Sequence, residues 1–222
     1  MTGRITNRSV YLEIGQKKIF ACYYEWPGWA RAAKSEELAL ESLASYAGRY
    51  GKVVRLAGID FDPAAAARFQ LVEKLPGSTT TDFGAPDARP EADWRPLTAG
   101  GADRLASLVE AAWRYFDGVA AAAPVSLRKG PRGGGRDRDR VVEHVLEAEA
   151  SYVRMLGLRL RVPGRTDSDA ISSFRQGVAA KLRAVRGVRR VTQGRSWPPR
   201  YLARRIAWHV LDHAWEIEDR SE

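Results

Sequence analysis

Cysteine is nearly absent from this chain of 222 residues, which contains Cys22 alone. A single cysteine cannot form a disulfide within the chain, so the predicted fold holds together without one. There is no run of about 18 apolar residues, which argues against a membrane-spanning helix. The opening residues MTGRITNRSVYLEIG also lack the apolar core of a secretory signal. These absences predict a cytoplasmic protein with no membrane partner.

The position of the one thiol argues against a nucleophilic role. In the segment KIFACYY, Cys22 alternates with Phe20 and Tyr24, so a strand would put all three side chains on one face. That face is expected to be buried, and a buried thiol is inert. A reactive Cys22 is the alternative interpretation.

Basic residues outnumber acidic ones, which gives a net charge of +9 and a pI of about 9.9. Such a surface attracts nucleic acid or other anions, although charge alone does not identify a specific contact. The most basic segment, SLRKGPRGGGRDRDR, lacks the GxxxxGK(S/T) spacing of a phosphate-binding loop, so a solvated connector is the favoured interpretation. Nucleic acid therefore stays an alternative partner.

The first part of the chain predicts a small unit of strands and one helix. Residues 9–14 alternate, and residues 18–24 form a second strand-like run, which predicts a β-hairpin. The following EWPGWA contains proline and glycine and is expected to interrupt the second strand. Ser35 and two glutamates predict a helix start, and apolar residues recur at helical spacing up to Gly58. Residues 68–75 alternate again, so the predicted order is ββαβ.

The second part of the chain is predicted to be helical. Residues 76–101 are rich in proline, glycine and small polar residues, which predicts an ordered crossing loop or an interdomain linker. Four amphipathic patterns follow, in residues 101–123, 138–156, 166–185 and 196–220. The expected caps of the last two helices are Thr166, in a capping box with Asp169, and Ser196.

The predicted fold class is therefore α+β. A small N-terminal ββαβ module with its crossing loop or linker occupies residues 1–96, and an antiparallel four-helix bundle occupies residues 97–222. The oligomeric state is left open, with a homodimer as one alternative.

Histidine is also scarce, and the chain has three: His144, His209 and His213. His209 and His213 are four residues apart, so a helix places both imidazoles on one side, one turn apart. Leu202 and Ile206 share that side, which predicts that it faces the bundle interior. His144 lies at the edge of the apolar stripe of its helix, a position that suits a ligand in a cavity opening to one side.

Three neutral imidazoles and one open position are typical of a catalytic Zn²⁺ site, and Ni or Fe also binds imidazole. Such an ion lowers the pKa of a bound water or thiol. Val210 stands where an HExxH metalloprotease motif has its glutamate, which excludes that class. Asp212 is expected to orient a metal-binding imidazole without contacting the metal itself. Glu216 and Arg205 are candidate polar groups of the cavity. Ordinary core or surface positions are the alternative for the histidines.

The segments VVEHVLEAEASYVRML and IAWHVLDHAW resemble the DinB/YfiT-like family, over about residues 97–222. Members of that family are four-helix bundles that bind a metal through one histidine of the second helix and an HxxxH pair of the last. The resemblance therefore implies His144, His209 and His213 as metal ligands. Members with known activity are thiol-dependent transferases or isomerases that use mycothiol, bacillithiol or glutathione. A small-molecule substrate and a low-molecular-weight thiol are implied here.

One departure from the family leaves the substrate open. Many relatives continue after HxxxH with a further histidine and a glycine-glutamine turn, whereas this chain reads AWEIEDRSE. The end of the last helix borders the expected cavity, so the shape of its mouth is not transferable from the family.

A looser resemblance covers residues 9–75. KIFACYYEWPGWARAAKSEELALESL is similar to the HicB-like fold, in which a strand runs into a PG turn and then a helix. There the small unit serves as an antitoxin or regulatory module. This implies the alternative function, a non-catalytic regulatory or binding protein that recognises protein or nucleic acid. The aromatic loop YYEWPGW is either an exposed interface or packed within the module.

Overall fold

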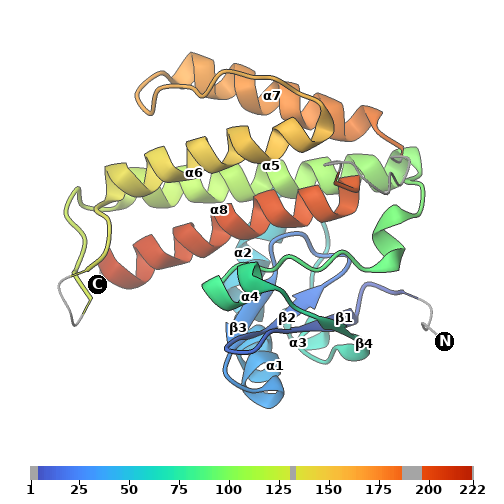
Figure 1. Ribbon diagram of the computed structural model, residues 1–222. Helices are drawn as coiled ribbons and strands as arrows, with labels where there is room; N and C mark the ends of the chain where they lie inside the picture. The colour runs from blue at the N-terminus through green and yellow to red at the C-terminus, as the bar shows by residue number, and fades with distance from the viewer. Residues whose placement is uncertain (1–4, 131–133, 187–196, 222) are drawn as a thin grey trace.

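The computed structural model describes residues 5–130, 134–186 and 197–221. Within them, an N-terminal mixed sheet of four strands is followed by long helices, which confirms the predicted α+β class. Figure 1 shows the sheet and its short helices on one side of the molecule and the long helices on the other. Ser196, the predicted cap of the last helix, lies outside the described residues.

The sheet has the strand order β3-β2-β1-β4. Its strands are β1 (Ser9–Ile14), β2 (Ile19–Tyr23), β3 (Ala30–Ala33) and β4 (Gln70–Pro76). β1 and β2 form the predicted hairpin, and β4 is the predicted last strand, parallel to β1. β3 is an unpredicted strand, because the sequence ARAA has no apolar alternation. The EWPGWA segment ends β2 as expected, but it then reverses the chain, so that β3 pairs antiparallel with β2.

Short helices cover one face of the sheet. α1 (Glu36–Ser45) begins as predicted, with the Ser35 hydroxyl accepting a hydrogen bond from the Leu38 N–H. The single predicted helix is in fact two, because α1 ends at Ser45 and α2 (Ala47–Leu56) begins after the shared cap residue Tyr46. α3 (Pro63–Ala66) precedes β4. The sheet residues buried with this layer are Val10, Leu12, Ala21 and Tyr23.

The other face of the sheet packs against the last helix and the crossing loop. It carries Tyr11, Phe20, Cys22 and Tyr24, which cluster with Trp208. The Phe20 ring meets the Trp208 ring edge to face, with centroids 5.9 Å apart. The sheet is thus buried on both faces, which explains why its central strands are apolar on both.

Residues 77–98, between β4 and the first long helix, form an ordered crossing loop with a short helix, α4 (Thr79–Phe83), and a 3₁₀ turn, η1 (Glu91–Trp94). Buried charges hold it in place. The Glu13 carboxylate accepts hydrogen bonds from the backbone N–H groups of Asp87 and Ala88. Asp93 forms a buried two-bond ion pair with Arg204 of the last helix. Because an unpaired buried charge is very unfavourable, these partners fix the path of the loop.

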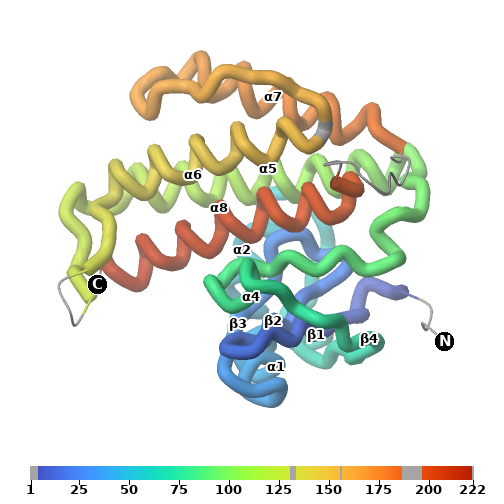
Figure 2. Tube along the Cα trace, in the orientation of Figure 1, coloured from blue at the N-terminus to red at the C-terminus, as the bar shows by residue number. Residues whose placement is uncertain are grey.

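The bundle consists of α5 (Ala99–Ala122), α6 (Arg138–Val153), α7 (Ser168–Ala184) and α8 (Pro199–Ser221), with a 3₁₀ turn, η2 (Arg154–Leu156), directly after α6. α5 and α8 run in one direction and α6 and α7 in the other, as the colours of Figure 1 show. The connection from α6 to α7 therefore runs back along the bundle (Figure 2). Asp167, rather than the predicted Thr166 capping box, caps α7 by accepting from the Ala170 N–H.

Gly28 is the point where the turn between β2 and β3 touches α8. Its φ is +93°, and a Cβ there would lie 2.7 Å from Leu211 Cδ1 and 3.1 Å from the backbone of Ala207. Gly58 also has a positive φ, of +68°, but a Cβ there would meet nothing within 4 Å. A side chain at Gly28 would therefore meet both backbone strain and a steric clash, whereas one at Gly58 would meet backbone strain alone.

We expect Gly28→Ala to lower the free energy of unfolding by about 3 kcal/mol, because it adds a clash to the backbone strain. Gly58→Ala, which adds strain alone, should cost about 1 kcal/mol. Urea denaturation of both variants measures the difference. Equal losses would show that the turn does not press on α8.

Glu149 of α6 is a fully buried carboxyl group in the bundle core. The indole N–H of Trp113 donates to Oε1, and Arg175 Nε lies 3.9 Å from Oε2. Burial raises the pKa of Glu149 to about 7, although Arg175 and Trp113 act in the opposite direction. In the unfolded chain the same group ionises near 4.5. The stability that protonated Glu149 contributes is therefore present below about pH 4.5 and is lost as pH rises through about 7.

We expect Glu149→Gln to make stability less dependent on pH. Relative to the unchanged protein, the variant should gain about 3 kcal/mol between pH 4.5 and pH 8, because the amide stays neutral and still accepts from Trp113. Glu147→Gln, at an exposed position on the same helix, is the matched control. Denaturant titration at several pH values measures the free energy of unfolding. If it changed with pH equally in the unchanged protein and in Glu149→Gln, the raised pKa would be contradicted.

Candidate metal centre

α8 positions two of the three histidines because it is buried on several sides. Arg204 and Trp208 face the sheet and crossing loop, and α5 and α6 pack against other sides of the helix. His209 is only 6% exposed, and His213 lies one turn further on and is partly buried. Tertiary packing therefore fixes the direction of both imidazoles before any ligand binds.

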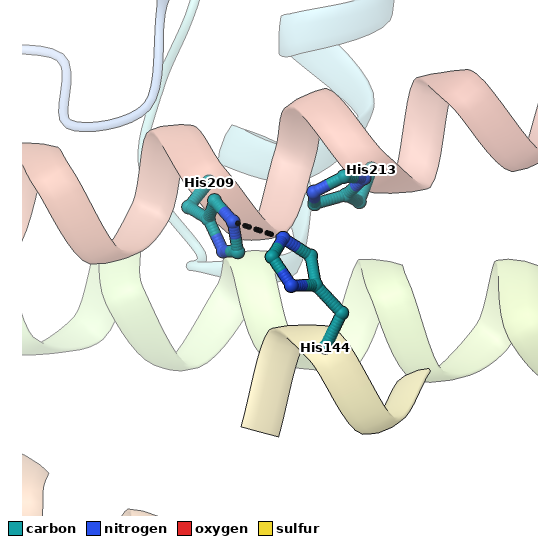
Figure 3. Close-up of side chains that lie close together, drawn as sticks. All are labelled: His144, His209 and His213. Atoms are coloured by element: carbon teal, nitrogen blue, oxygen red, sulfur yellow. Dashed lines mark hydrogen bonds between the residues drawn. The ribbon is translucent and has the colours of Figure 1, made fainter. Parts of the chain in front are cut away.

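The three imidazoles meet between α6 and α8. Figure 3 shows His144 projecting from α6 toward His209 and His213 on α8. His144 Nε2 lies 3.2 Å from His209 Nε2. One ligand atom from each of the three rings lies within 4.8 Å of the others. The ring centroids are 4.6 to 5.0 Å apart. The pair predicted from helical spacing and the distant His144 thus form one cluster.

The cluster has the dimensions of a metal site. Two nitrogens bound tetrahedrally to one zinc at about 2.0–2.1 Å are about 3.3 Å apart. The observed 3.2 Å between the Nε2 atoms of His144 and His209 is close to that value. Without an ion, an N–H of one ring donates to the other across the same distance. Replacing that shared proton with a divalent cation therefore requires little movement of these two rings.

A carboxylate holds the third ring. His213 Nδ1 lies 2.8 Å from Glu216 Oε2, and the other oxygen of Glu216 accepts from Arg220 at 2.7 Å. With Nδ1–H donating to Glu216, Nε2 of His213 carries the free lone pair. Carboxylate-to-histidine contacts of this kind orient metal-binding imidazoles and raise their basicity. His209 differs, because its Nδ1 is buried without a hydrogen-bond partner among the described residues.

Burial and neighbouring charges favour the neutral form of two of the three rings, His209 and His144. Burial lowers the pKa of His209 well below its ordinary value, and the adjacent His213, His144 and Arg205 lower it further. Burial, His213 and Arg136 also lower the pKa of His144, against the opposing effect of Glu147. Neutral imidazoles are the form that binds metal. These two rings can therefore accept a cation at neutral pH.

The three predicted polar neighbours have different positions. Glu216 contacts His213. Arg205 is buried beside the cluster, with its guanidinium 5.3 Å from the centroids of the Tyr152 and Trp208 rings, and it donates to the Pro86 carbonyl at 2.6 Å.

Asp212, predicted to orient a ligand, is instead bonded to Arg31 of β3 at 2.8 Å. The direction of its side chain around the helix explains this, because it faces the sheet module. Cys22 lies in the sheet core, where burial raises the pKa of its thiol, as expected for an inert group.

The charged residues that line a cavity beside His144 were not predicted from the sequence. An open cavity of ≈ 330 Å³ is lined by Arg136, Arg140, Glu143, His144 and Glu147. Arg136 belongs to the basic connector, which the sequence predicts to be solvent-exposed. Glu147 is on the same helix as His144. The i, i+3 spacing of Glu147 from His144 was an available signal. The position of Arg136 depends on how the connector folds, and no local pattern predicts that.

Comparisons of the chain with protein-family models, characterised proteins and solved structures find no match. The DinB/YfiT-like and HicB-like resemblances therefore stay predictions. What the fold and the site define is an α+β protein with a three-histidine cluster between two bundle helices. Among the described helices, none combines the length and apolar character needed to cross a membrane.

We expect Glu216→Gln to reduce the affinity for Zn²⁺ by about 10- to 100-fold, because the amide no longer polarises the His213 ring. Asp212→Asn is the matched control, since it lies on the same helix, loses the same charge and is bonded to Arg31 instead. Competition with a chromophoric chelator measures both affinities. Equal affinities for the two variants would show that Glu216 does not support a metal ligand.

Proposed function

We propose that this protein binds one divalent metal ion through His144, His209 and His213 and acts as a thiol-dependent transferase or isomerase. The observation that supports the metal most strongly is the convergence of three imidazoles from two helices. Three protein ligands leave a fourth tetrahedral position for a thiol or substrate. The thiol-dependent chemistry rests on the resemblance to the DinB/YfiT-like family.

Zinc is the proposed ion, with nickel and iron as alternatives. Imidazole binds all three, so the donor set alone does not choose among them. The 3.2 Å separation of two ligand nitrogens fits the short bonds of a tetrahedral zinc site. When bound, the ion supplies a Lewis acid that lowers the pKa of a thiol or water at its free position.

The residues around the cluster have separate proposed roles. Glu216 would hold His213 in the tautomer whose Nε2 can bind, and Arg220 would hold Glu216. Arg205 beside His209 would disfavour protonation of the buried ring. Tyr152, whose ring centroid is 5.7 Å from that of His209, would limit access of water from that side.

A regulatory or binding protein without catalysis is the alternative function, but the aromatic loop does not favour it. Trp26 and Trp29 are both buried, and their indole N–H groups donate to the carbonyls of Asn7 and Leu43. Trp29 stacks between Tyr23 and Tyr50, with centroids 4.4 and 5.0 Å away. The loop therefore stabilises the module itself and offers these two rings to no partner.

We expect the purified protein to bind about one zinc ion per chain, and His209→Ala to lose most of that binding. Affinity should fall as pH decreases below about 6, since protons compete for the imidazoles. Elemental analysis after dialysis against zinc, at pH 8 and at pH 5, measures both effects. Equal zinc content at the two pH values under limiting zinc, or none at either, would contradict histidine ligation.

A further inference from the structure

The cavity beside His144 contains a cation that has no partner among the residues that the structure describes. Four charged side chains line it together with His144: Arg136, Arg140, Glu143 and Glu147. Arg140 donates to Glu143 at 2.7 Å, and Arg165 contacts the same carboxylate at 3.2 Å. Arg136 makes no hydrogen bond or ion pair with any described residue. The cavity therefore presents one free guanidinium close to the metal cluster.

Arg136 is within electrostatic reach of the cluster. Its positive charge contributes to lowering the pKa of both His144 and His209. It directly precedes Asp137, the N-cap of α6, and Asp137 is itself tied to the connector by the Leu127 N–H at 3.1 Å and by Lys129 at 2.5 Å. The start of α6 is thus anchored, which holds the backbone of Arg136 at the edge of the cavity.

The charge balance of the cavity favours a ligand with one negative charge. Glu147 is exposed, has no ion-pair partner among the described residues and lies one turn from His144. A dianionic phosphate group would be repelled by this carboxylate and would meet a single free guanidinium. A carboxylate matches that guanidinium in charge and in its two-oxygen geometry.

We propose that Arg136 binds a carboxylate group of the molecule that occupies the fourth metal position, so that the thiol or substrate is a small carboxylic acid. This inference rests on the proposed metal site. It makes Arg136 a specificity-determining residue. Arg136 binds the acid group on one side of the cavity while the cluster binds the thiol on the other.

The test uses the full chain loaded with Co²⁺, whose absorption reports thiolate binding directly. Two probes of equal length are titrated, 3-mercaptopropionate and 3-mercapto-1-propanol, with affinities referred to the thiolate form of each. We expect the acid to bind about tenfold more tightly to the unchanged protein, as for one charged hydrogen-bonded contact at a partly exposed site. In Arg136→Gln this ratio should fall to about one, and Arg136→Lys should restore part of it.

Arg140→Gln is the matched control, because it removes the same charge from the same cavity but from a guanidinium already bonded to Glu143. It should keep most of the preference for the acid. A preference that survives Arg136→Gln, or one lost equally in Arg140→Gln, would overturn the assignment of Arg136.

The cobalt spectra test the carboxylate contact and the metal site separately. If Co²⁺ binds and both probes bind equally to the unchanged protein, the carboxylate contact is wrong while the metal site stands. If no cobalt spectrum develops at all, the metal site itself is wrong, and the inference is overturned with it.

Discussion

The structure depends on the burial of α8 between the sheet module and the rest of the bundle. Trp208 and Arg204 anchor one side of this helix to the sheet and crossing loop, while His209 and His213 are directed toward α6. A helix confined on several sides cannot rotate without breaking apolar contacts and the Arg204–Asp93 ion pair, both of which are costly to lose. The geometry of the histidine cluster therefore follows from packing that is remote from it.

The same confinement sets the surroundings of the two α8 histidines. Burial disfavours imidazolium at His209, and the Glu216 carboxylate selects one tautomer of His213. His144 comes from a different helix and lines an open cavity, so the cluster is closed on the α8 side and accessible on the α6 side. A site that is buried on one side and open to solvent on the other suits a ligand that enters beside His144.

Local patterns predicted much of this arrangement, and the remainder depends on tertiary contacts. The i, i+4 spacing put His209 and His213 on one side of a helix, and alternation identified β1, β2 and β4. β3 was not predicted, because it pairs with β2 only through the chain reversal at Gly28, and that turn packs against α8. Asp212 is three residues from His209, and this spacing predicts that both side chains lie on neighbouring parts of the helix surface. No local pattern showed that Arg31, far away in sequence, would bind it instead.

X-ray absorption at the zinc edge of protein loaded with one equivalent of Zn²⁺ tests the three-histidine site most directly. We expect three imidazole nitrogens at about 2.0–2.1 Å, with the multiple-scattering pattern of histidine, plus one light-atom ligand. Replacing His144 with alanine should remove one imidazole from this shell. A shell with fewer than three imidazoles in the unchanged protein, or with a sulfur ligand in the absence of added thiol, would contradict the three-histidine site.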